Sequence, residues 1–165
     1  MLKRKITNKI EEYLKSDSKK MLIVDGARQI GKSFIIRHVG QEMFENFIEI
    51  NMEEDKLSDR LFADATSVEK FYIAVSSFAG ERMKERDKTL VFIDEIQAYP
   101  HLLTLVKFLM ADNRFRFIAS GSLLGVTLQK TQFIPIGSIE RVHMYPLDFE
   151  EFLWANNVGE LAIYE

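Results

Sequence analysis

Residues 26–33 have the amino-acid types and spacing of a phosphate-binding loop, Gly-Ala-Arg-Gln-Ile-Gly-Lys-Ser. Gly26 and Gly31 allow backbone conformations that turn successive N–H groups inward around phosphate oxygens. Lys32 would then reach the β- and γ-phosphates, and the hydroxyl of Ser33 would be a ligand of Mg²⁺. The pattern therefore predicts a binding site for a nucleoside triphosphate.

The segments around this loop supply the context that the motif requires. The apolar residues 21–24 precede it as a candidate strand, and residues 33–39 follow it with the composition of a helix. A helix beginning near Lys32 would direct the positive end of its dipole at bound phosphate. Arg28 either reaches phosphate or extends into solvent. The residues predicted to bind the nucleotide are Gly26, Ala27, Arg28, Gln29, Ile30, Gly31, Lys32, Ser33 and Phe34.

A second acidic motif follows the apolar run at residues 89–93. Asp94 and Glu95 stand directly after this run, as in a Walker B strand with an additional acid. Asp94 would hold the hydrated Mg²⁺ together with Ser33, and Glu95 would polarise the water that attacks the γ-phosphate. An acidic pair after an apolar strand is a weak signal alone, because many strands end on charge. Together with the loop it indicates nucleotide hydrolysis.

Two polar residues at predicted strand ends leave alternatives open. Ser120, which follows residues 115–119, would contact the attacking water or the γ-phosphate as a sensor residue, or would cap a turn. Asn51, at the end of residues 47–51, would hold Glu95 in an unproductive position until a partner binds, or would form an ordinary turn. The predicted catalytic residues are Glu95, Lys32 and Ser120, and the predicted metal-binding residues are Ser33 and Asp94.

The pattern along the chain predicts strands that alternate with helices. We expect strands at about residues 20–25, 47–51, 89–93, 115–119 and 139–145, and helices at about 3–16, 33–43, 57–63, 67–79, 100–111 and 148–156. This alternation indicates an α/β fold, with helices on both faces of a mainly parallel five-stranded sheet in three α-β-α layers. The loop, Asn51, Asp94 and Ser120 then lie at the carboxyl ends of strands, where such sheets bind ligands.

The same layout indicates which nucleotide is bound. A strand between the loop strand and the acidic strand is typical of the ATPase branch with an additional central strand, not of GTPases or nucleotide kinases. A guanine-reading Asn-Lys-x-Asp is missing downstream of the loop. Residues 8–11, Asn-Lys-Ile-Glu, precede the loop and end on a different acid. The sequence therefore predicts ATP and Mg²⁺ as ligands.

The composition is that of one globular domain, with 165 residues of which 47% are hydrophobic and 28% charged. Within a formal net charge of −3, residues 1–20 carry seven basic and three acidic side chains. Contact with nucleic acid is one interpretation of this segment. An amphipathic helix over residues 1–18 is the better one, because apolar residues recur there at helical spacing: Leu2, Ile6, Ile10, Tyr13 and Leu14.

Several classes of site and location are disfavoured. The chain has no cysteine, which excludes disulfides, thiolate chemistry and cysteine-based metal sites. Its three histidines are scattered and lack metal-ligand spacing. No apolar segment is long enough to span a bilayer, and the N-terminus lacks the apolar region of a secretory signal. We expect a cytoplasmic protein without membrane association.

With both nucleotide motifs in view, the sequence resembles a group of prokaryotic AAA+-like ATPases in which an N-terminal P-loop domain precedes a C-terminal domain of uncharacterised function. The likeness is carried, in the family's order, by residues 26–33, 92–97, 119–124 and 145–153. It implies an AAA+-type core with strand order 5-1-4-3-2, ATP and Mg²⁺ as ligands, and the roles given above for Lys32, Ser33, Asp94, Glu95 and Ser120.

The chain ends at Glu165, shortly after the last of these stretches. We therefore expect a single P-loop ATPase domain over residues 1–165, without the family's C-terminal domain. Ring-forming AAA+ proteins usually carry an arginine finger in the stretch corresponding to residues 121–138, which holds only Lys130 as a cation. Slow hydrolysis is expected, because charge stabilisation by a neighbouring subunit accelerates this reaction by orders of magnitude.

Two classes of function fit these features. The first is an ATPase domain that drives or gates an attached module. The second is an ATP-dependent switch or binding module for DNA or a protein client with little turnover, for which the basic residues 3–20 are the only hint. Phosphoryl transfer to a small molecule is disfavoured, because Glu95 is placed to act on water. The sequence leaves the client and the oligomeric state open.

Overall fold

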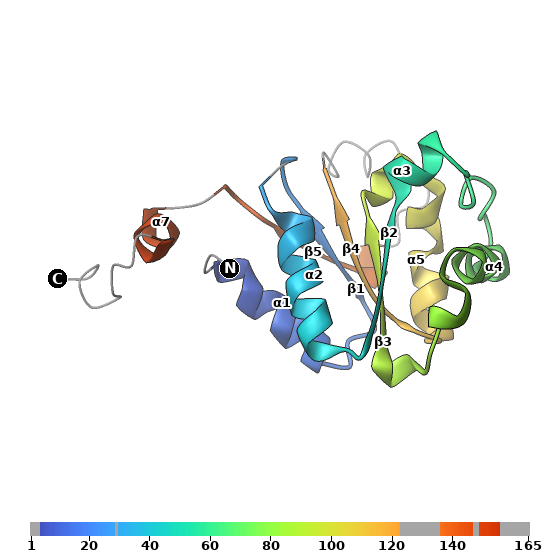
Figure 1. Cartoon of the computed structure of the whole chain (residues 1–165), viewed down its shortest axis with the longest axis horizontal. Coiled ribbons are helices and arrows are strands. Elements are labelled where there is room, and N and C mark those ends of the chain that lie inside the picture. The colour runs from blue at the N-terminus through green and yellow to red at the C-terminus, as the bar shows by residue number, and fades with distance from the viewer. Residues whose placement is uncertain (1–3, 29, 123–135, 147–148, 156–165) are drawn as a thin grey trace.

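The computed structural model describes residues 4–28, 30–122, 136–146 and 149–155. A five-stranded sheet runs through its centre in the order β2-β3-β4-β1-β5 (Figure 1). All neighbouring strands pair in parallel. The predicted sheet and its order 5-1-4-3-2 are confirmed. The strands are β1 (Met21–Asp25), β2 (Asn46–Asn51), β3 (Thr89–Asp94), β4 (Arg116–Gly121) and β5 (Ile139–His143).

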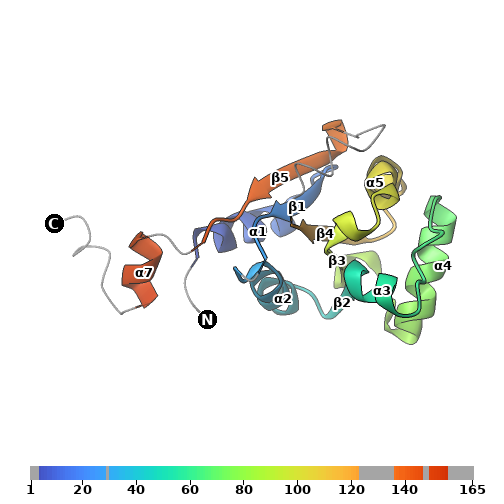
Figure 2. The same ribbon diagram turned by 90° about the horizontal axis from the view of Figure 1, so that it is seen from above.

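Helices cover both faces of this sheet, which confirms the three-layer α-β-α architecture (Figure 2). One face carries α1 (Lys5–Lys15) and α2 (Lys32–Met43), and the other carries α4 (Val68–Ala79) and α5 (His101–Asp112). None of the described helices has the length and apolar character needed to cross a membrane. The remaining described helices are α3 (Met52–Leu57), α7 (Phe149–Ala155) and the 3₁₀ turns η1 (Gly80–Arg82), η2 (Arg86–Lys88), η3 (Ile96–Ala98) and η4 (Ile136–Ser138).

The two faces of the sheet form two separate cores, because successive side chains of a strand point to opposite faces. Leu22 and Val24 of β1 pack with α1 and α2, whereas Met21 and Ile23 pack with α4 and α5. The apolar face of α1 lies fully in the first core through Ile6, Ile10, Tyr13 and Leu14. The amphipathic interpretation is therefore confirmed for Lys5–Lys15, and this helix packs as part of the fold. Leu2 lies outside the described residues.

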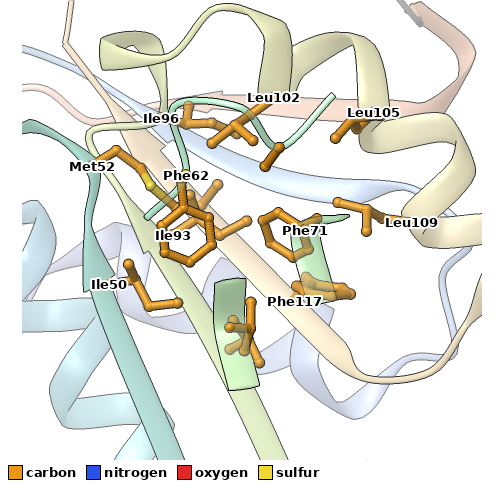
Figure 3. Close-up of a cluster of buried hydrophobic side chains, with 14 of the residues drawn as sticks. Ile50, Met52, Phe62, Phe71, Ile93, Ile96, Leu102, Leu105, Leu109 and Phe117 are labelled. Carbon is orange, nitrogen blue, oxygen red and sulfur yellow. The ribbon is translucent and has the colours of Figure 1, made fainter. Parts of the chain in front are cut away.

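Aromatic rings occupy the centre of the second core (Figure 3). The ring centroid of Phe71 lies 5.6 Å from that of Phe62 and 6.2 Å from that of Phe117. All three side chains are fully buried. This cluster connects α4 to β4 and to the segment after α3, and so holds these elements together on one face of the sheet.

One predicted helix, at residues 57–63, is wrong. The helix begins earlier, as α3, because the side-chain oxygen of Asn51 accepts hydrogen bonds from the N–H groups of Glu53 and Glu54 at 3.0 and 3.1 Å. The chain then turns, with Arg60 at a φ of 53°. The carboxylate of Asp55 closes this turn by accepting hydrogen bonds from the N–H groups of residues 61 and 62. Side-chain capping thus overrides the apolar periodicity.

The carboxylate of Asp55 also joins α3 to the segment that follows β3. The hydroxyl of Tyr99 donates to Asp55 Oδ2 at 2.9 Å, and Tyr99 is 4% exposed. Burial, together with this hydrogen bond and the charge of Asp55, raises the pKa of Tyr99 to about 12. The contact holds two chain segments that leave neighbouring strands at the same end of the sheet.

Shortening Phe71 tests the aromatic core. We expect Phe71→Ala to lower the free energy of unfolding by about 3–5 kcal/mol, since it removes a fully buried ring and leaves a cavity. Ile73→Ala on the same helix is the matched control, because Ile73 is 66% exposed. It should change stability by less than about 0.5 kcal/mol. Urea unfolding measures both, and equal losses would contradict this account of the core.

Tyr99 gives the stability of the fold a pH dependence. The raised pKa means that the unfolded chain releases this proton first, near pH 10.0, whereas the folded chain keeps it until about pH 12. The stabilisation is complete below pH 10.0 and is lost as the pH rises through this interval. Tyr99→Phe should therefore show a shallower fall in unfolding free energy over this range. Urea titrations at several pH values measure it, and identical slopes for parent and variant would refute it.

Candidate nucleotide site

The loop after β1 is held against two neighbouring strands. The N–H of Gly26 donates to the carbonyl of Gly121 at 3.3 Å, and the N–H of Met144 donates to the carbonyl of Asp25 at 2.7 Å. A Cβ atom at Gly26 would lie 2.5 Å from the carbonyl oxygen of Met144. Gly31, directly before α2, has a φ of 93°. Both glycines are therefore required by the backbone, one for close approach and one for a left-handed conformation.

Lys32 lies inside this loop, not on its surface. The residue is 5% exposed, and its Nζ donates to the carbonyls of Gly26 and Ala27 at 2.7 and 2.6 Å and to Ser122 Oγ at 3.2 Å. Burial lowers the pKa of Lys32, and the carboxylates of Glu95, Asp94 and Asp25 act in the opposite direction. The ammonium group of Lys32 is thus held beside the backbone of the loop, where it would contact the oxygens of a bound phosphate.

Asp94 is the point at which three elements converge. Ser33 Oγ of α2 donates to Asp94 Oδ2 at 2.9 Å, and Ser120 Oγ of β4 donates to Asp94 Oδ1 at 2.5 Å. The amide of Asn51, at the end of β2, donates to Asp94 Oδ2 at 3.4 Å. Asp94 is only 4% exposed, so these hydrogen bonds replace the water that its charge would otherwise require.

The side chains of Ser33 and Asp94 have the oxygen donors that Mg²⁺ prefers. The hydroxyl of Ser33 and the carboxylate of Asp94 are hard oxygen ligands, 2.9 Å apart. Within the described residues, no group of three or more His, Cys, Asp or Glu side chains could hold a metal ion. Mg²⁺ does not require such a cage, because it commonly uses one or two protein ligands together with water and substrate phosphates.

The two residues with open alternatives take different roles. Asn51 contacts Asp94 and caps α3, so of its two alternatives the structure supports the local backbone role and not a contact with Glu95. A strand-end amide capping the next helix is the ordinary role that the sequence also allowed. Ser120 lies within β4, fully buried, and its hydroxyl orients Asp94 rather than capping a turn. Its role as a sensor of the γ-phosphate stays a prediction.

Glu95 follows β3 in a left-handed conformation, with φ 52° and ψ 52°. The side-chain amide of Gln97 donates to Glu95 Oε2, and Ser122 Oγ donates to Glu95 Oε1 at 3.2 Å. Neither Gln97 nor Ser122 is among the functional residues predicted from the sequence. Two signals were available: both residues are polar at neighbouring strand ends, and both lie in segments that carry the family resemblance, residues 92–97 and 119–124. Their meeting depends on the turn at Glu95.

The remaining predicted loop residues are less closely engaged. The guanidinium of Arg28 forms an exposed ion pair with Glu53, with an Nη2–Oε1 distance of 2.5 Å. This hydrogen bond raises the pKa of Arg28 further. The side chain is thus partnered by a carboxylate, which neither alternative for it included. Phe34 is 55% exposed on the first turn of α2. Gln29 lies outside the described residues.

A basic residue far from the motifs also contacts the loop. The guanidinium of Arg4 donates to the carbonyl of Ile30 at 3.3 Å, to the carbonyl of Tyr145 at 2.6 Å and to Glu151 at 3.1 Å. Its side chain is 9% exposed and that of Glu151 is 6% exposed. Arg4 therefore belongs to the support of the loop rather than to a solvated basic face, and no local pattern identifies it.

Asn51 combines two roles that can be separated by a matched variant. Asn51→Ala should lower the free energy of unfolding by about 1 kcal/mol through loss of the α3 cap. Ser67→Ala removes the cap of α4, where Ser67 Oγ accepts from the N–H of Lys70, and should cost a similar amount. Only Asn51→Ala should also raise the Mg²⁺ concentration needed for nucleotide binding, because it alone removes one of the three hydrogen bonds that orient Asp94. Titration calorimetry tests this, and equal Mg²⁺ dependence in both variants would refute it.

Comparison with known proteins places this geometry in a family. The chain is similar to a Walker-type ATPase of Pyrococcus abyssi, with a TM-score of 0.57 and 18% identity over 96% of this chain and 60% of that one, a likeness of fold. It is 26% identical over 97% of its length to an uncharacterised protein of Methanocaldococcus jannaschii, of which it spans 33%. A family model described as an AAA domain matches residues 18–153. The chain therefore belongs to this AAA domain family, as its Walker motifs indicated.

Proposed function

We propose that this chain binds Mg·ATP and hydrolyses it slowly, as an ATPase domain that drives or gates an attached module. The observation that carries the proposal is the meeting, at one end of the sheet, of the buried Lys32 with the Ser33–Asp94 pair. Membership of the AAA domain family implies nucleotide binding.

Each residue has a defined task in this proposal. The loop amides and Lys32 bind the phosphate tail, and Ser33 and Asp94 hold the metal ion. Mg²⁺, when bound, neutralises charge on the phosphate oxygens. Ser120 and Asn51 keep the Asp94 carboxylate oriented through their hydrogen bonds. Glu95 accepts a proton from the attacking water as general base.

The attached module is inferred from the greater length of the curated relative that the chain matches. The chain spans about a third of the curated relative that it matches, and its described part ends in α7 beside the start of α1. In a longer protein, nucleotide-dependent changes at the loop would reach such a module through the segment after β5.

The choice of ATP as the nucleotide is supported by the sequence, because the guanine-reading motif Asn-Lys-x-Asp is missing downstream of the loop.

DNA binding gains no specific support from the described residues. The apolar face of α1 is buried in the core, and Arg4 is engaged with Glu151 and two backbone carbonyls. The exposed basic residues of this helix are Lys5, Lys9 and Lys15, which alternate with Asn8 and Glu12 along its outer face. A solvated face explains this pattern, and the ATP-dependent binding module stays a prediction from the sequence.

Two variants separate binding from turnover. Lys32→Ala should weaken Mg·ATP binding by at least about 100-fold, because it removes a buried charge from the phosphate site. Glu95→Gln should keep nucleotide affinity within about threefold and lower the turnover rate by at least about 100-fold, because the amide cannot accept a proton. Lys107→Ala on the outer face of α5 is the control. Calorimetry with Mg·ATP and a phosphate-release assay measure the two properties.

The outcomes are distinguishable. If well-folded parent protein gives neither binding heat nor thermal protection with Mg·ATP, the proposed function is wrong. If Glu95→Gln turns over at the parent rate, Glu95 loses its assigned role while nucleotide binding stands. If Lys107→Ala behaves like Lys32→Ala, the loss reflects general charge and not the loop.

A further inference from the structure

The turn at Glu95 places its carboxylate against two polar side chains, those of Gln97 and Ser122. Its φ of 52° is uncommon for a residue with a side chain, and residues held in this way gather at functional sites. The chain continues directly into η3, so that Gln97 returns to the side chain two residues before it. The end of β4 supplies the third member, Ser122, which is 3% exposed.

Glu95, Gln97 and Ser122 form a closed ring of hydrogen bonds. Gln97 Nε2 donates to Glu95 Oε2, Ser122 Oγ donates to Glu95 Oε1 at 3.2 Å, and the N–H of Ser122 donates to Gln97 Oε1 at 3.3 Å. Both carboxylate oxygens and both ends of the amide are engaged. A flipped amide would set its oxygen against the carboxylate and its NH₂ against an N–H, so one orientation satisfies the ring.

The ring continues to the phosphate site. Ser122 Oγ, which donates to Glu95, also accepts a hydrogen bond from Lys32 Nζ at 3.2 Å. A single hydroxyl therefore lies between the lysine of the loop and the carboxylate of Glu95. This places Glu95 on the side of the site where the terminal phosphate of a bound nucleotide would meet Lys32.

The turn itself does not need the side chain of Gln97. Its backbone is closed by the N–H of Ala98, which donates to the carbonyl of Glu95 at 3.1 Å, and by the N–H of Tyr99, which donates to the carbonyl of Ile96 at 3.2 Å. Gln97 is only half-buried, so water would satisfy its amide if it pointed outward. A structural role for the amide is therefore weak, and its contacts point to Glu95.

We propose that Gln97 is a positioning residue, which together with Ser122 holds the Glu95 carboxylate toward Lys32 so that it is aligned for the attacking water. This inference rests on the proposed function, in which Glu95 is the general base. A carboxylate with free rotation would spend little time in a productive position, and small displacements of a reacting group carry large rate penalties. Gln97 acts on the rate through Glu95 and leaves nucleotide affinity unchanged.

A double-mutant cycle tests this role. Gln97→Ala should lower kcat by at least about tenfold while the KM and Kd for Mg·ATP stay within about twofold. In the Glu95→Gln background the same change should have no further effect in a single-turnover assay, because the group it positions is gone. Gln41→Ala, on the exposed part of α2, is the matched control and should match the parent.

Gln97→Glu is the second variant, which keeps the shape of the side chain and the oxygen that accepts from the N–H of Ser122. It replaces the donor toward Glu95 by a like charge, so kcat should fall at least as far as in Gln97→Ala. If Gln97→Ala proves unfolded by circular dichroism, Gln97→Glu alone decides the question. A parent-like kcat in the folded variants, or an equal further loss in the Glu95→Gln background, overturns the inference.

The proposed function can fail separately. Parent-like turnover in Glu95→Gln removes the general base and with it the proposed function's catalytic step. Loss of turnover in Glu95→Gln, with an unchanged rate in Gln97→Ala and Gln97→Glu, removes only the positioning role.

Discussion

The carboxylate of Asp94 is the constraint on which the arrangement of the nucleotide site depends. Its charge is almost fully buried, and it accepts hydrogen bonds from α2, β4 and the end of β2. A buried charge without such donors would be costly, so the donors must stay in place together. β4 lies between β3 and β1 in the sheet, so Ser33, which follows β1, reaches an acid two strands away. The start of α2 is thereby held across the end of β4.

Much of this arrangement follows from local sequence features. The glycine and lysine spacing of residues 26–33 identifies the loop, and apolar runs such as residues 21–24 and 89–93 identify central strands. Parallel strands bring their carboxyl ends to one edge, which is why Ser33, Asp94 and Ser120 could be expected near one another. The family resemblance supplied the strand order. The predictions of the loop and of the strands, by contrast, depend on short segments whose conformation is set largely by their own residues.

Other contacts depend on backbone geometry that no short pattern encodes. The pairing of Gln97 with Glu95 requires a left-handed residue at the end of β3, and the place of Ser122 requires β4 to extend beyond the apolar run. The start of α3 was misplaced because capping by Asn51 and turn closure by Asp55 outweigh apolar periodicity. Arg4 belongs to the loop only because α1 packs beside it, 26 residues away in sequence from Ile30.

The position of Arg4 also constrains how the domain can change shape. One guanidinium group contacts the loop at Ile30, the segment after β5 at Tyr145 and the helix α7 at Glu151. Withdrawing α7 would leave this nearly buried cation without its carboxylate partner, which is strongly unfavourable. The loop and the last described helix therefore share a common anchor. Any rearrangement that separates α7 from the sheet must either carry Arg4 along, pulling at the start of α1, or hydrate it.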